Sequence, residues 1–221
     1  MPERLKMIFI TFEGPEGSGK TTQINLLERY LKSSGIAVLK TREPGGSLIA
    51  EKIRKILLDP KNKAMAAQAE LMLYLASRAQ HVKDKIKPSL KKGIAVICDR
   101  FSDSTMAYQG FGRGFSKPLI ENLNAFATQG LKPDLTFYID INVNLGLRRA
   151  RKRSGKKDRL ESENSVFHNK VRKGYLTIAK KEPGRIKILC GDKPKDIIAG
   201  QIRSFTENKF RKHLRNTDKR S

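Results

Sequence analysis

Residues 14–21 read Gly14-Pro15-Glu16-Gly17-Ser18-Gly19-Lys20-Thr21, between an apolar run and an amphipathic one. The stretch matches G-x-x-x-x-G-K-[ST], the spacing of a phosphate-binding loop that joins a strand to a helix. Glycines let the backbone curl until successive N–H groups point inward, and the helix that follows adds the positive end of its dipole. We therefore predict that this loop binds the phosphates of a nucleoside triphosphate. Lys20 is expected on the β- and γ-phosphates, and the Thr21 hydroxyl on Mg²⁺.

Five short apolar runs alternate with longer amphipathic stretches along the chain. Near-continuous hydrophobicity is typical of strands that are buried on both faces. The runs are Met7–Phe12, Ile36–Thr41, Ile94–Cys98, Leu135–Ile141 and Ile186–Leu189. The helical patterns are Lys20–Ser33, Leu48–Leu58, Ala66–Leu90, Lys117–Thr128, Leu145–Lys152, Asn164–Lys181 and Lys195–Phe210. This order predicts an α/β fold, a five-stranded parallel sheet with helices on both faces, in a single domain spanning residues 1–221.

Polar clusters follow the first three predicted strands, at residues 13–21, 42–46 and 99–100. Ligands of open parallel sheets bind beyond the carboxyl ends of the strands, so we expect these clusters to form one site. Asp99 closes a buried strand and is a candidate Mg²⁺ ligand. Arg100 is suited to bind an acceptor phosphate with two parallel hydrogen bonds. Arg42 fits the same role or an ion pair with a nearby acid.

Composition limits the remaining classes of protein. No apolar run approaches the length of a membrane span, no export signal is evident, and two cysteines fit a reducing compartment, so we expect a cytoplasmic protein. Forty-six Lys and Arg against 22 Asp and Glu give a net charge of +24, which attracts polyanions. Because the charge is spread along the chain, we interpret most of it as solvated surface, with nucleic acid not required as a partner. A nucleic-acid-binding P-loop ATPase remains an alternative.

Four further motifs resemble those of the thymidylate kinase family, in that family's order, from about Phe9 to Glu161. They are Thr41-Arg42-Glu43-Pro44-Gly45-Gly46, Asp99-Arg100, Ala107-Tyr108-Gln109-Gly110-Phe111-Gly112-Arg113-Gly114, and Asp158-Arg159 after a basic stretch. The resemblance implies a P-loop nucleoside-monophosphate kinase fold. It also implies transfer of the γ-phosphate of ATP to dTMP, with Mg²⁺ as cofactor, and a homodimer.

The resemblance extends to the acceptor site. Glu16 matches an acid that contacts the 3′-hydroxyl of the acceptor, and Tyr108 matches an aromatic residue under the deoxyribose. Tyr74 and Arg78, four apart on one helix face, match a ring that stacks on thymine and an arginine that binds its carbonyl. From the sequence alone, without the resemblance, Tyr74 is better interpreted as an ordinary core residue. The expected substrate-binding set, in which Ser104 and Gln109 read the thymine edge, is Glu16, Arg42, Glu43, Pro44, Tyr74, Arg78, Arg100, Ser104, Tyr108 and Gln109.

The phosphate loop contains no arginine at its variable positions. In the family, the arginine that stabilises phosphoryl transfer then comes from a mobile lid, which the resemblance places at about residues 146–162. The expected catalytic residues are Lys20, Arg100, Arg149, Arg151, Arg153 and Arg159. Two features depart from the family: Phe101 stands where Tyr or His is common, and a basic tail, residues 208–221, has no assigned role.

A second alternative within the kinases is a deoxynucleoside kinase, whose acceptor is a sugar hydroxyl. That reaction needs a carboxylate base beside the 5′-oxygen, commonly in a Glu-Arg-Ser sequence, whereas this chain has Asp99-Arg100-Phe101. GTPases read guanine through Asn-Lys-x-Asp, which the sequence does not contain.

Overall fold

The computed structural model describes residues 7–154 and 159–217, except for the side chains of residues 151–154 and 212–217. Its five strands form one parallel sheet in the order β2-β3-β1-β4-β5, which confirms the predicted sheet. The strands are β1 (Phe9–Glu13), β2 (Val38–Arg42), β3 (Ala95–Asp99), β4 (Leu135–Asp140) and β5 (Ile186–Cys190). Each lies within two residues of its predicted position.

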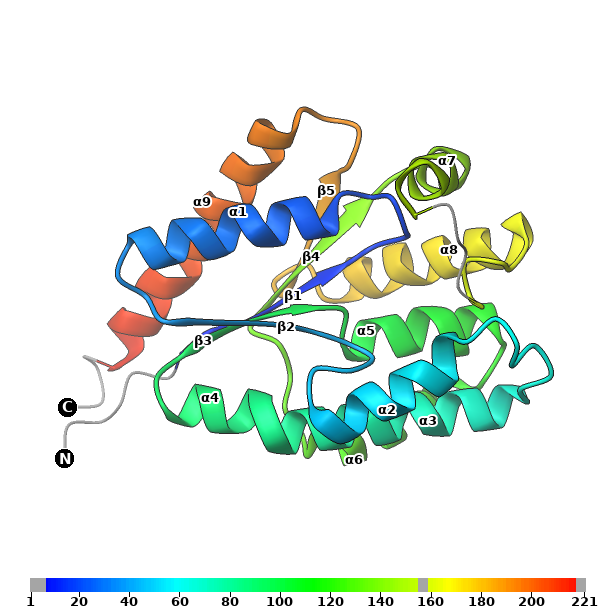
Figure 1. The fold of residues 1–221 in the computed structure, drawn as a ribbon. Coiled ribbons are helices and arrows are strands. Elements are labelled where there is room, and N and C mark those ends of the chain that lie inside the picture. The colour runs from blue at the N-terminus through cyan, green and yellow to red at the C-terminus, as the bar shows by residue number, and fades with distance from the viewer. Residues whose placement is uncertain (1–6, 155–158, 218–221) are drawn as a thin grey trace.

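Helices cover both faces of the sheet (Figure 1). Their bounds are α1 (Lys20–Ser33), α2 (Leu48–Leu58), α3 (Ala67–His81), η1 (Val82–Ile86), α4 (Lys87–Lys91), α5 (Ser102–Thr105), η2 (Met106–Gly112), α6 (Lys117–Thr128), α7 (Val143–Ser154), α8 (Ser165–Lys181) and α9 (Lys195–Thr217). Helices α1 and α9 lie together on one face, and the helices between β2 and β3 lie across the other.

Side chains of β1 show why both faces are apolar. Ile10 and Phe12 pack into the cluster formed with α1 and α9, whereas Phe9 packs with η1 and β3 on the opposite face. Successive side chains of a strand point to opposite faces, so a central strand needs a continuous apolar run. This requirement produced the pattern from which the strands were predicted.

Three helical regions differ from the prediction. The predicted helix Ala66–Leu90 is divided into α3, the π-helical turn η1 and α4, and a second π-helical segment, η2, follows α5 in a region with no predicted helix. Glycine-rich sequence such as residues 107–114 lacks the period by which helices are recognised. Helix α9 extends to Thr217, seven residues past the predicted end and into the predicted tail.

No described helix is both long enough and apolar enough to cross a membrane.

Candidate active site

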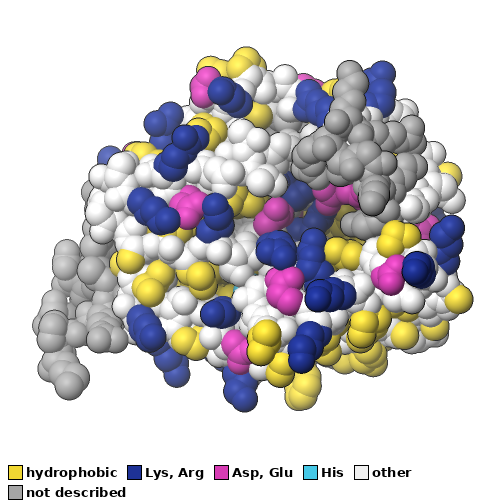
Figure 2. All heavy atoms as spheres, viewed as in Figure 1, with side chains coloured by type: hydrophobic (Ala, Val, Ile, Leu, Met, Phe, Trp, Pro, Cys, Tyr) yellow, Lys and Arg dark blue, Asp and Glu magenta, His cyan; other side chains and the backbone are white. Residues whose placement is uncertain are grey.

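A cavity of about 480 Å³ opens at the carboxyl edge of the sheet. Figure 2 shows basic and acidic side chains gathered around a hollow on this face. The predicted site residues that line the cavity are Glu16, Gly17, Gly19, Lys20, Thr21, Arg42, Glu43, Pro44, Tyr74, Asp99, Arg100, Ser104, Tyr108 and Gln109. The loops after β1, β2 and β3 therefore converge on one cavity, as the topology requires.

The phosphate loop is confined on one side by the sheet and on the other by α7. Gly14 and Gly17 have φ angles of 143° and 71°, in the region that favours glycine. A Cβ on Gly14 would lie 2.6 Å from the carbonyl oxygen of Ile139 in β4, and one on Gly17 would collide with the carbonyl of Gly146 in α7. Both glycines are thus required by close backbone approach as well as by the turn.

Lys20 lies inside the concavity of the loop. Its Nζ donates hydrogen bonds to the carbonyl oxygens of Gly14 at 3.0 Å and Pro15 at 2.9 Å. Burial, together with the nearby charge of Arg100, lowers the pKa of the ammonium group. A partly desolvated ammonium interacts strongly with phosphate oxygens, because less water screens the charge.

Asp99 and Thr21, the predicted Mg²⁺ ligands, both line the cavity, and each offers an oxygen atom that could hold the ion. Within the described part of the chain, Oδ1 of Asp99 is buried and has no hydrogen-bond partner. Such an atom is costly unless a ligand satisfies it. Mg²⁺ in kinase sites is held by one or two protein oxygens together with phosphates and water, a donor set that these residues can complete.

Arg100 adopts a backbone conformation that is rare for a residue with a side chain. Its φ is 70°, and such strain is found mainly where the surrounding structure enforces it. Nη2 donates to Oε1 of Glu16 at 2.5 Å, Nη1 donates to the hydroxyl of Tyr175 at 3.3 Å, and the guanidinium lies 5.3 Å above the ring of Tyr108. Glu16 therefore faces a cation, as expected of an acid within an anion-binding loop. The Sγ of Cys98 donates to the backbone oxygen of Arg100 at 3.1 Å and supports the turn from below.

Glu13 is a buried acid that begins the first polar cluster but to which no motif gave a role. Its Oε1 accepts the backbone N–H of Phe101 at 2.8 Å, and Oε2 accepts the hydroxyls of Ser104 at 2.6 Å and Tyr175 at 2.9 Å. Burial, and then the charge of Asp103, raise the pKa of Glu13 to about 7. The carboxyl group thus joins β1 to the loop after β3 and to α8. Its position at the end of a buried strand was the signal available in the sequence.

The aromatic side of the cavity is formed by Tyr74 from α3 and Tyr108 from η2. The ring of Tyr108 meets those of Phe167 and Tyr175 edge-on, with centroids 6.1 and 6.3 Å apart. These contacts fix the ring at the wall of the cavity. Gln109 reaches the same wall while its Nε2 donates to Oε1 of Glu70 at 2.9 Å.

Arg78 lies beneath this wall and does not line the cavity. Its Nε donates to Oε2 of Glu43 at 2.7 Å and Nη2 to the carbonyl of Phe101 at 3.0 Å, while Nη1 reaches the side-chain oxygens of Thr105 and Asn124, both at 2.6 Å. Glu43 and Thr105 do line the cavity. In this structure, Arg78 therefore supports the lining residues from behind.

Two further arginines lie near the loop after β2. Arg42 forms an exposed ion pair with Glu51 at 3.0 Å, the alternative role considered for it. Arg54, which the sequence reasoning missed, lines the cavity and donates to the carbonyl of Pro44 at 2.7 Å. No motif pointed to Arg54, because it lies in the ordinary amphipathic pattern of α2.

The side chain of Phe101 points away from the cavity. It is fully buried, and its ring meets that of Phe9 edge-on at a centroid distance of 4.9 Å. The departure from the family at this position therefore changes the core and leaves the cavity lining unaltered.

The four predicted lid arginines do not share one place. Arg149 lies against the phosphate loop: its Cβ would be 3.0 Å from a Cβ on Gly17, and its Nη1 donates to the carbonyl of Gly191 at 3.2 Å. Arg159 is buried outside the cavity lining, where it donates to Oε2 of Glu70 at 2.6 Å. The side chains of Arg151 and Arg153 lie outside the described residues.

Comparisons with known proteins agree with this geometry. The family model described as thymidylate kinase matches residues 12–202. A thymidylate kinase of Geotalea daltonii is 54% identical over 189 residues, covering 83% of this chain and 88% of the relative. One from Desulfovibrio desulfuricans is 44% identical over 217 residues, covering 96% and 100%. The crystal structure of thymidylate kinase from Ehrlichia chaffeensis superposes with a TM-score of 0.74 at 37% identity, covering 91% of this chain and 98% of that one. The chain belongs to the thymidylate kinase family.

Proposed function

We propose that this protein transfers the γ-phosphate of ATP to dTMP, which yields ADP and dTDP. The observation that carries the proposal is the single cavity in which the phosphate loop faces Arg100 and the aromatic wall. Membership of the thymidylate kinase family supports the choice of acceptor. A deoxynucleoside kinase is not favoured, because the segment after β3 carries no Glu-Arg-Ser base motif.

On the donor side, the loop N–H groups and Lys20 bind the β- and γ-phosphates. Asp99 and Thr21 would hold Mg²⁺, and the bound ion would neutralise phosphate charge. On the acceptor side, Arg100 binds the phosphate of dTMP and Glu16 binds its 3′-hydroxyl, and the two side chains now held together separate to receive the nucleotide. The acceptor phosphate is already nucleophilic, so positioning and charge neutralisation dominate the catalysis.

The charge that develops on the transferred phosphoryl group needs a further cation. We assign this role to the arginines of α7, namely Arg149, Arg151 and Arg153, within a lid at about residues 146–162. The close approach of α7 to Gly17 of the phosphate loop supports the assignment. We retain Arg159 as a proposed lid residue, although its guanidinium donates a hydrogen bond to Glu70 in this structure.

The test of the acceptor is ADP release from ATP and Mg²⁺ with dTMP, dUMP, dCMP, dGMP and dAMP in parallel. We expect the highest kcat/KM with dTMP. Equal or higher kcat/KM with another monophosphate would refute the assignment of dTMP.

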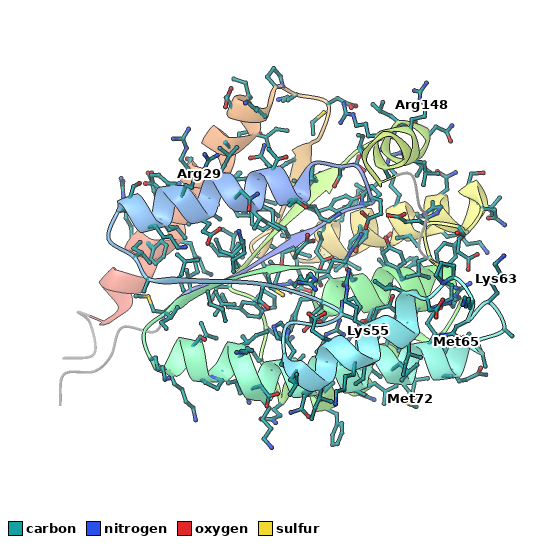
Figure 3. The ribbon with its side chains drawn as sticks, viewed as in Figure 1. Arg29, Lys55, Lys63, Met65, Met72 and Arg148 are labelled. Atoms are coloured by element: carbon teal, nitrogen blue, oxygen red, sulfur yellow. The ribbon has the colours of Figure 1, made fainter. Side chains whose placement is uncertain are left out.

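We also propose that the protein is a homodimer, on an apolar surface formed by α2, α3 and α6. The large exposed apolar side chains there are Leu48, Ile49, Ile56, Met72, Leu119 and Phe126. Phe126 is 85% exposed, and Met72 points away from the sheet at the lower edge of Figure 3. Exposed apolar patches of this kind mark contact surfaces.

Sedimentation of the protein and of a Phe126→Asp variant tests the dimer. We expect the mass of a dimer for the unaltered protein and a shift toward monomer in the variant. A monomer before substitution would refute the proposal.

We place the enzyme in the cytoplasm, where two unpaired thiols remain reduced.

A further inference from the structure

Glu70 is a completely buried acid at the start of α3 that does not line the active-site cavity. Its Oε1 accepts Nε2 of Gln109 at 2.9 Å and Nε of Arg113 at 3.2 Å. Its Oε2 accepts Nη2 of Arg113 at 3.0 Å and Nη1 of Arg159 at 2.6 Å. One carboxylate thus joins Gln109 of η2 to Arg159, which lies before α8.

The two arginines keep this acid ionised. Burial alone would raise the pKa of Glu70, but hydrogen bonds from Arg113, Gln109 and Arg159 lower it below the ordinary value. Arg113 also forms an ion pair with Glu163, with 2.7 Å between Nη2 and Oε1. The cluster therefore contains two cations, Arg113 and Arg159, and two anions, Glu70 and Glu163. Glu70 is therefore a carboxylate across the neutral pH range, and a carboxylate can only accept hydrogen bonds.

Because Glu70 can only accept hydrogen bonds, it determines the orientation of the Gln109 side-chain amide. Nε2 must point to Glu70, because the amide oxygen would repel the carboxylate. The oxygen then occupies the other branch of the amide, and Gln109 lies at the cavity wall. A base that offers an N–H donor suits this oxygen, whereas a base that offers a lone pair there does not.

We propose that Glu70 is a positioning residue for base selection: it holds the carbonyl oxygen of Gln109 toward the cavity, and so favours pyrimidine acceptor bases that carry a hydrogen on ring nitrogen N3. Thymine and uracil carry such a donor at N3, where cytosine carries an acceptor. The inference rests on the proposed function and extends it to a residue that does not touch the substrate. Buried polar groups that are left unpaired by a wrong substrate give strong discrimination.

The experiment compares kcat/KM for dTMP and 5-methyl-dCMP, which share the methyl group and differ only on the Watson–Crick edge. Glu70→Gln keeps the shape but gives residue 70 a donor, which allows the amide of Gln109 to turn over. We expect the ratio of the two kcat/KM values to fall by about tenfold or more, the scale of one hydrogen bond to a buried polar group. A purely structural role would lower both values together and leave the ratio unchanged.

Glu163→Gln is the matched control, because it removes a charge from the same cluster without contacting Gln109, and its ratio should equal that of the unaltered protein. If Glu70→Gln does not fold, Glu70→Asp keeps the charge for both arginines but withdraws it from Gln109 by one methylene, and the same relaxation is expected. An unchanged ratio in either folded variant would overturn the inference. If the unaltered protein does not prefer dTMP, it is the proposed function that fails.

Discussion

The donor and acceptor sides of the cavity are built from different parts of the chain. The donor side is one continuous loop of eight residues, whose binding groups are mainly backbone N–H groups and a single lysine. The acceptor side is assembled from side chains of several elements and depends on buried acids, Glu13, Glu43 and Glu70, each held by hydrogen bonds. Phosphate is recognised by a local motif, whereas a nucleoside requires a network that only the folded chain brings together.

The largest effect is expected on the donor side. Lys20→Ala removes the buried cation whose charge is shared with the phosphates, so kcat should fall by about 10³-fold, at the upper end of losses for one electrostatic contact. The thermal midpoint should change little, because no packed apolar group is lost. Steady-state kinetics measure the loss of kcat, and thermal unfolding measures the midpoint. A loss of less than tenfold would mean that the backbone alone binds the transferred group.

Arg149→Ala tests whether α7 belongs to the donor side. We expect kcat to fall by about 30- to 100-fold while KM for dTMP changes by less than about threefold, because the cation acts on the transition state. Arg148→Ala is the control, since Arg148 points away from the sheet at the outer surface of α7 (Figure 3). Equal kcat in both variants would remove Arg149 from catalysis.

Glu13→Gln tests the acceptor network through stability. The pKa of about 7 in the folded protein lies above the ordinary 4.5, so the folded state binds this proton more tightly than the unfolded state. The contribution of Glu13 to stability is therefore full below about pH 4.5 and is lost as the pH rises through 7. The amide in the Glu13→Gln variant mimics the protonated acid, so the fall in unfolding free energy between about pH 5 and pH 8 should shrink by about 1–3 kcal/mol. Denaturant unfolding at pH 5 and pH 8 measures this change in unfolding free energy. The same pH dependence in both proteins would contradict the raised pKa of Glu13.

The same contrast explains what the sequence could predict. The strands and the phosphate loop follow from local patterns, namely apolar runs and glycine spacing, and the structure has them within two residues. The partners of Gln109 and Arg159 could not be foreseen, because Glu70 lies 39 and 89 residues away from them along the chain. Arg78 was expected to face the base, yet four buried acceptors hold it behind the wall. A motif indicates the residue type, while direction is determined by long-range partners.

The two cysteines give this protein a practical property. Cys98 is fully buried beneath Arg100, and burial raises the pKa of its thiol well above the ordinary value, so it reacts slowly with alkylating reagents. Cys190 is exposed at the end of β5, next to Gly191, whose carbonyl accepts the hydrogen bond from Arg149. A maleimide dye should therefore attach at one position without any mutagenesis. Its fluorescence would report how α7 moves against the nucleotide edge during turnover.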